Sequence, residues 1–181
     1  MVKPIPGEEQ RRIIEEALPR LSRTQRAAFA AGCVERVLPI VEHHFGDARQ
    51  CRAALELVWR FALGEAVDDS EIAASASECD ALVDELREDG ETGGAIRAIK
   101  ATWYALESMR KAEAKPARDA AWEAQTAADF EESKEGDEFI QEEAEWQVRA
   151  LRICEQEKPS RTMFDALPRD SRWMSALKSR G

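Results

Sequence analysis

The sequence predicts an all-α fold, a single-domain bundle of seven to eight helices joined by short loops. Two observations lead to this prediction: apolar residues recur at helical spacing along the chain, and capping residues or breakers flank most of these segments. Valine and isoleucine occur singly at that spacing, whereas strands would show them in alternating runs. A chain of 181 residues is long enough for one domain with a sizeable core.

The expected helices are bounded by their caps and stops. The first covers about 8–20 with a break at Pro19, and the second runs from the N-cap Ser22 to Phe45, where Gly46 stops it. Five further helices are expected to begin after Asp47, Asp68, Thr92-Gly93-Gly94, Lys115 and Asp137, with stops near Gly64, Gly90 and Pro159.

Two of these starts have the spacing of a capping box, in which the side chains of the cap and of the third helical residue bond each other's backbone amides. Asp47 with Gln50 has this spacing, and so does Asp68 with Glu71. The alanines of the sixth helix predict a close approach by a neighbouring helix; they stand at 117, 120, 121, 124, 127 and 128.

The domain is expected to cover 1–181, with a core of about 8–157. The remaining tail, 158–181, is expected to hold short helical pieces around 164–167 and 173–177.

Acidic residues are concentrated in two blocks of a chain whose formal net charge is −10. Residues 67–94 and residues 123–145 each hold ten acidic residues and one basic residue. This balance argues against nucleic acid as a partner, because binding phosphates requires a basic surface. Each block is either a solvated helix face or a docking surface for a basic protein. The candidate docking residues are Asp84, Glu85, Glu88, Asp89, Glu138, Glu142 and Glu145.

The four cysteines, at 33, 51, 79 and 154, form no Cys-x-x-Cys pair and fall at apolar helical positions. We therefore expect reduced core thiols in a cytoplasmic protein. No segment approaches membrane-spanning length, and the N-terminal stretch has no apolar run of signal-peptide length. We expect no membrane association.

His43 and His44, the two histidines of the chain, raise the question of a metal site. A di-metal bundle needs Glu-x-x-His and a zincin needs histidines four residues apart, and neither pattern is present. Adjacent helical residues diverge by about 100°, so we interpret both as last-turn residues that bond free carbonyls and favour the helix dipole. Motifs for nucleophilic or phosphate chemistry are also missing, so we expect no catalytic residue, no cofactor and no metal.

Two of the five tryptophans lie away from the predicted core stripes. Trp122 stands among alanines and Trp173 stands in the polar tail. Both are candidate partner anchors, with ordinary packing as the alternative.

The stretch 21–65 resembles the opening of a helical bacterial immunity-protein family, the fifth of the numbered families. Its features are F-x-x-x-C-x-E-R-x-x-P, an acidic loop, and a helix that ends in Trp and Gly-Glu; 143–153 is similar to that family's E-x-x-W-Q-x-x-x-L segment. A related helical family of unknown function shares Cys-x-Glu-Arg-x-x-Pro. The residues that carry the resemblance are Phe29, Cys33, Glu35, Arg36, Pro39, Trp59, Gly64, Trp146 and Gln147.

The resemblance implies a non-enzymatic antidote that binds and occludes a cognate secreted toxin domain in the cytoplasm. Combined with the acidic blocks, it favours a basic toxin, for example a nuclease domain. Two alternatives stay open. One is a metal- or ligand-binding bundle or an enzyme, with Glu35, Arg36, His43 and His44 near a pocket. The other is a housekeeping helical protein with different partners.

Glu35 and Arg36 stand next to Pro39, which removes the backbone hydrogen bond that would reach the carbonyl of Glu35. We expect a kinked helix there. We also expect both side chains to lie in a structural polar network that ties this helix to the third or the seventh.

Overall fold

The computed structural model describes residues 7–88, 93–131, 138–168 and 172–179. Within these ranges the chain forms helices and turns and no strand, so the fold is the all-α bundle that the sequence predicts. The helices are α1 (Glu8–Ala17), α2 (Arg23–Phe45), α3 (Arg49–Ala62), α4 (Asp69–Glu88), α5 (Gly94–Arg110), α6 (Lys115–Phe130), α7 (Glu138–Gln156) and α8 (Arg172–Ser179), and a short 3-10 helix covers Leu18–Arg20.

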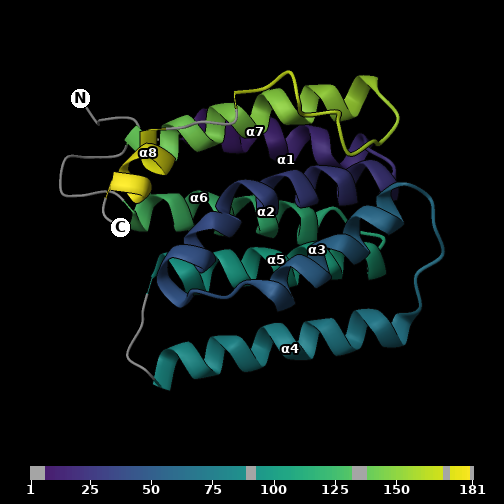
Figure 1. The fold of residues 1–181 in the computed structure, drawn as a ribbon. Coiled ribbons are helices and arrows are strands. Elements are labelled where there is room, and N and C mark those ends of the chain that lie inside the picture. The colour runs from purple at the N-terminus through teal and green to yellow at the C-terminus, as the bar shows by residue number, and fades with distance from the viewer. Residues whose placement is uncertain (1–6, 89–92, 132–137, 169–171, 180–181) are drawn as a thin grey trace.

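Helix α2 is the centre of the bundle and packs against α3, α5, α6 and α7 (Figure 1). Its residues 26–34 are all buried, as expected of a helix surrounded by others. Helices α1 and α7 lie along one side, and α3 and α5 lie along the other. Helix α4 lies at the edge of the bundle opposite α7 and packs against α3 and α5.

Pro39 lies inside α2, and the helix continues past it to Phe45. Figure 1 shows α2 changing direction toward its C-terminal end. An internal proline explains this bend, because it removes one backbone hydrogen bond and its ring crowds the preceding turn.

The alanines of α6 allow the close approach predicted for them. This helix packs against α2, α5 and α7, and small side chains let the backbones approach on several sides. All six of these alanines are fully buried: Ala117, Ala120, Ala121, Ala124, Ala127 and Ala128.

The caps of α2 agree with the sequence, but both proposed capping boxes are wrong. Ser22 and Gln25 form a box at the start of α2, and Gly46 ends it in the left-handed conformation. Helix α3 begins one residue later than a box at Asp47 would require. Asp47 instead accepts a hydrogen bond from the amide of Arg49, at 2.9 Å.

At the start of α4, Asp68 accepts from the amide of Ser70 at 2.7 Å. Glu71 turns instead toward Arg60 of α3, at 3.6 Å. Glu71 therefore contacts α3 and does not complete a box with Asp68. Asp137, the predicted cap of the seventh helix, lies outside the described residues.

Side chains at the start of α2 donate hydrogen bonds to backbone carbonyls at the C-terminal ends of two other helices. Gln25 donates to the carbonyl of Cys154 on α7 at 2.6 Å, and Arg26 donates to the carbonyl of Ala112, just after α5, at 2.6 Å. Arg23 donates to the carbonyl of Met109. Cations at helix C-termini satisfy free carbonyls and complement the helix dipole.

The C-terminal tail contributes to the core. Met163, Phe164, Trp173 and Leu177 are buried, and α8 covers the second of the two expected short helices. The first, 164–167, is a run of turns rather than a helix. The chain after 157 therefore completes the core between α2 and α7.

Candidate functional site

Glu35 and Arg36 connect α2 to two different helices. Glu35 accepts a hydrogen bond from the indole nitrogen of Trp59 on α3, at 2.9 Å. The guanidinium of Arg36 donates from Nε to Oε2 of Glu143 on α7, also at 2.9 Å. Neighbouring side chains on a helix point about 100° apart, so Glu35 contacts α3 while Arg36 contacts α7. The expected network is present, and it includes both the third and the seventh helix.

The Arg36–Glu143 ion pair is buried, with side-chain exposures of 6% and 0%. Arg36 also donates to the carbonyl of Pro168 at 3.1 Å, and its guanidinium lies 4.6 Å from the ring centroid of Trp146. A buried charge is tolerated only when it is paired and hydrogen-bonded. Arg36 therefore joins α2, α7 and the chain that follows α7.

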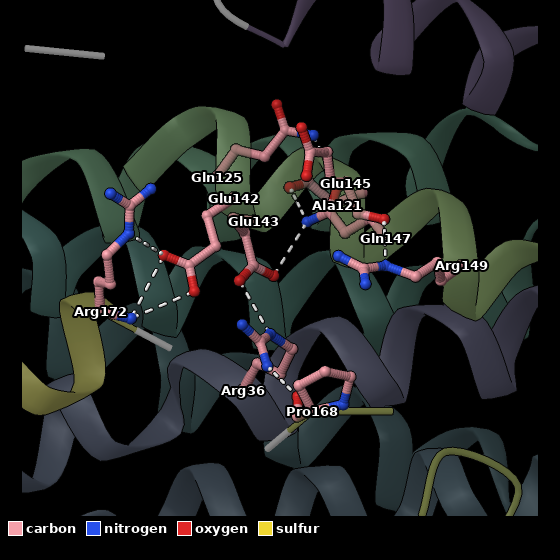
Figure 2. A network of polar contacts seen from close by, with 10 residues as sticks. All are labelled: Arg36, Ala121, Gln125, Glu142, Glu143, Glu145, Gln147, Arg149, Pro168 and Arg172. Atoms are coloured by element: carbon pink, nitrogen blue, oxygen red, sulfur yellow. Dashed lines mark hydrogen bonds and ion pairs between the residues drawn. The ribbon is translucent and has the colours of Figure 1, made fainter. Parts of the chain in front are cut away.

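From Glu143 the polar contacts continue along α7 to Gln147 and across to Gln125 on α6 (Figure 2). From Gln125 they reach Arg11 on α1. Gln147 donates to Glu143 at 3.4 Å and to the carbonyl of Ala121 at 2.9 Å. Gln125 donates to Gln147 at 2.6 Å and accepts from Arg11 at 2.7 Å. We call Arg36, Glu143, Gln147, Gln125 and Arg11 the buried polar network.

Burial shifts the pKa values of two groups in opposite directions: Arg11, which belongs to this network, and Cys33, which lies beside it. It lowers the pKa of the Arg11 guanidinium, an effect that Asp129 partly opposes. It raises the pKa of the Cys33 thiol well above its usual value, and the nearby Glu143 raises it further. The charged side chains of this network are hydrogen-bonded to specific partners. A network bonded in this way specifies how the helices pack.

The sequence identified only part of this network. Arg36 and Gln147 belong to the motif and Glu143 begins its E-x-x-W-Q segment, whereas Gln125 and Arg11 drew no prediction. A usable signal for Gln125 was its position among the inward-facing alanines of α6, where a polar side chain needs a buried partner.

The remaining motif residues lie in the core or at a helix end. Phe29 and Cys33 are fully buried on α2, and Trp59 and Trp146 are buried on α3 and α7. Gly64 follows α3 with φ 87°, a left-handed conformation that glycine adopts without strain. The motif thus marks the junction of α2, α3 and α7.

A cavity of about 520 Å³ opens at this junction. Glu35, Arg36 and Pro39 line it from α2, together with Trp146 of α7 and residues of α3, α8 and the segment before α8. The alternative of a ligand-binding bundle expects a pocket near Glu35 and Arg36, and this cavity lies there.

His43 and His44 are not among the residues that line the cavity. His44 lies 2.7 Å from the buried carboxylate of Glu131, and the two histidine rings stack edge to face with centroids 4.9 Å apart. His44 therefore pairs with a carboxylate, where we expected it to bond the free carbonyls of the last turn. In the described parts of the chain, no three His, Cys, Asp or Glu side chains are grouped so that they could hold a metal ion.

The first acidic block forms the exposed side of α4. We call Asp69, Glu71, Glu78, Asp80, Asp84, Glu85 and Glu88 the α4 acidic face; all are exposed, and Arg87 is the single basic residue of the helix. The candidates Asp84, Glu85 and Glu88 lie on this face, and the Asp84 side chain is 72% exposed. The candidate Asp89 lies outside the described residues.

The candidates of the second acidic block make contacts within the chain, although Glu138 and Glu145 are exposed. Arg172 at the start of α8 contacts Glu138 at 2.5 Å through Nη1, and its backbone amide donates to Glu142 at 3.1 Å. Glu145 accepts from Gln141 at 2.9 Å. Glu138 and Glu142 therefore connect α7 to the start of α8, contacts that the charge pattern did not predict.

Of the two alternatives for Trp173, a partner anchor or ordinary packing, the structure agrees with packing and not with the anchor. This side chain is fully buried, because α8 packs its apolar side onto the bundle, so it cannot contact a partner unless α8 moves. Trp122 is half-buried, and the guanidinium of Arg118 lies 4.3 Å from its ring centroid.

Together the fold and these contacts define an all-α bundle with a buried polar network, a cavity at the motif and an acidic outer helix. Comparisons with protein-family models, curated proteins and solved structures found no match to this chain. Within the described ranges, none of the helices is both long and apolar enough to cross a membrane.

Proposed function

We propose that this protein is a non-catalytic, cytoplasmic immunity-type protein that binds a basic toxin domain through the α4 acidic face. The observation that carries the proposal is the placement of α4. It lies at the edge of the bundle, and it buries Ile72, Ala76, Cys79, Leu82, Val83 and Leu86 while its carboxylates face solvent.

Such a surface suits association with a basic protein. Carboxylates of one sign on an exposed helix raise the encounter rate with a positively charged partner and disfavour acidic ones. Within the described chain, two of the seven carboxylates have ion pairs with basic side chains, Glu71 with Arg60 and Asp84 with Arg87. The resemblance of 21–65 to an immunity family supports the same class by analogy alone.

Co-expression tests the proposal. The chain would be produced with each toxin candidate encoded beside its gene, and cell survival and co-purification would be measured. We expect one candidate to be neutralised and to co-purify. If none of them is neutralised, the immunity function is wrong.

A pair of charge-reversal variants tests the docking surface. Asp84→Lys/Glu85→Lys/Glu88→Lys changes the α4 acidic face, and Glu113→Lys/Glu155→Lys/Glu157→Lys makes the same charge change at exposed positions outside α4. We expect only the first to slow association, by about tenfold or more at low salt and less at high salt. Equal effects of the two variants would place the docking surface elsewhere.

A further inference from the structure

The cavity at the motif has the size and lining of a small-molecule site. Its volume of about 520 Å³ lies within the range of known ligand pockets, roughly 300–1,000 Å³. Its lining comes from α2, α3, α7, α8 and the segment between α7 and α8, so several parts of the fold hold its shape.

The floor of the cavity is apolar. Leu38, Leu55, Trp146, Phe164 and Leu177 line it, and each of these residues is buried. An apolar floor favours a ligand with a hydrocarbon or aromatic body, because such a ligand removes its own apolar surface from water on binding.

Cationic side chains surround this floor. Arg52, Arg161 and Lys178 line the cavity from three different segments and are exposed. Arg36 also lines it from α2, but its charge is balanced by Glu143. In a chain with a net charge of −10, these three exposed cations outnumber the two carboxylates of the lining, Glu35 and Asp165. They favour an anionic group on the ligand.

The ion pairs of the exposed arginines do not prevent these side chains from binding an anionic group. Arg52 pairs with Glu42 and Arg161 pairs with Glu56, and neither glutamate lines the cavity. Both pairs are exposed, and exposed pairs contribute little to stability. An arriving carboxylate can therefore share these guanidinium groups at low cost.

Two carboxylates in the lining limit the charge of the ligand. Glu35 and Asp165 would repel a polyphosphate or a dicarboxylate more strongly than a group with one negative charge. We propose that this cavity binds a small amphipathic monoanion, an apolar chain or ring that carries one carboxylate. The proposal is independent of the α4 acidic face, which lies on other residues.

Titration of the full chain with matched probes tests the proposal. The probes are decanoate, which has both features, decanol, which has no charge, and inorganic phosphate, which has no apolar body. Binding would be followed by calorimetry and by tryptophan fluorescence, because Trp146 lines the cavity. We expect decanoate to bind saturably at one site, decanol to bind at least about tenfold more weakly, and phosphate not to bind.

A variant pair separates this site from general surface binding. Arg52→Gln/Arg161→Gln removes two exposed cations of the cavity, and Arg12→Gln/Arg149→Gln removes two exposed arginines that do not line it. We expect the first variant to weaken decanoate by about tenfold or more and to leave decanol unchanged, whereas the control leaves both unchanged.

Three results would overturn the proposal: equal affinities for decanoate and decanol, unsaturable binding at many sites, or decanoate binding that both variants leave unchanged. Circular dichroism during the titration identifies a fourth, unfolding of the chain by decanoate in place of binding. Loss of the α4 acidic face in the variant described above should leave decanoate binding intact, so failure of one proposal is distinguishable from failure of the other.

Discussion

Arg36 on α2 and Glu143 on α7 form an ion pair of 2.9 Å, 107 positions apart in the chain, in which both side chains are buried. Removal of one partner leaves the other charge buried without compensation, which costs about 3–5 kcal/mol in comparable pairs. The relationship therefore predicts strong coupling between two distant residues.

A double-mutant cycle measures this coupling. We expect Arg36→Met and Glu143→Leu each to lower the free energy of unfolding by about 3–5 kcal/mol, and the double variant to lose clearly less than the sum. Urea denaturation gives the three values. The matched control is Arg12→Met, whose ion pairs with Glu9 and Glu16 are exposed, and we expect a change within about 1 kcal/mol. Additive losses would show that the buried pair has no special energetic role.

At Gly32, side-chain packing determines whether a substitution raises or lowers the free energy of unfolding. In an isolated helix, glycine to alanine stabilises by about 1 kcal/mol. Here a methyl group at Gly32 would overlap the ring of Phe164, which packs onto α2 from the C-terminal segment. We expect Gly32→Ala to lower the free energy of unfolding by about 1–3 kcal/mol. A second variant, Phe164→Leu, should relieve part of this loss when combined with it, and a stabilised Gly32→Ala would contradict the packing described here.

Trp173 gives a test of the role of α8. Because this side chain is fully buried, we expect Trp173→Ala to lower the free energy of unfolding by about 3–5 kcal/mol. Arg172→Ala removes the contacts with Glu138 and Glu142, and we expect a smaller loss, about 1 kcal/mol. Thermal denaturation followed by fluorescence compares the two. An unchanged stability of Trp173→Ala would indicate that α8 does not dock in solution.

Cys154 predicts how stability changes at alkaline pH. Burial raises the pKa of this thiol to about 12, against 9.0 for an ordinary thiol. Above pH 9 the unfolded chain therefore loses this proton while the folded chain keeps it, so the group lowers stability as pH rises. Between pH 9 and 10 we expect a contribution of about 1 kcal/mol.

Urea denaturation of the native chain and of Cys154→Ala at pH 7, 9 and 10 provides the measurement. Other groups titrate equally in both chains, so the difference in their slopes isolates the thiol. The stability of Cys154→Ala should fall less steeply above pH 9. Parallel curves would show that the thiolate forms as readily in the folded chain as in the unfolded one.

The sequence by itself determined the helices of this protein and much of their order. Helical spacing and local caps act within a few residues, so the bounds of α2, the alanine side of α6 and the acidic character of α4 could all be predicted. The network around Glu35 and Arg36 was also predictable, because a proline beside charged residues on a buried helix requires polar partners.

The tertiary structure alone decided which distant groups meet. Sequence spacing cannot show that Glu143 and Pro168 contact Arg36. Nor can it show that Gln125 continues the network to Arg11. The ion pairs of Arg172 with two candidate docking carboxylates are equally invisible to it. Sequence spacing also left the place of Trp173 open, because a short polar tail gives no local sign that it folds back onto α2 and α7. Local hydrogen bonding sets where a helix begins and ends, whereas the burial of side chains from separate helices sets what each residue contacts.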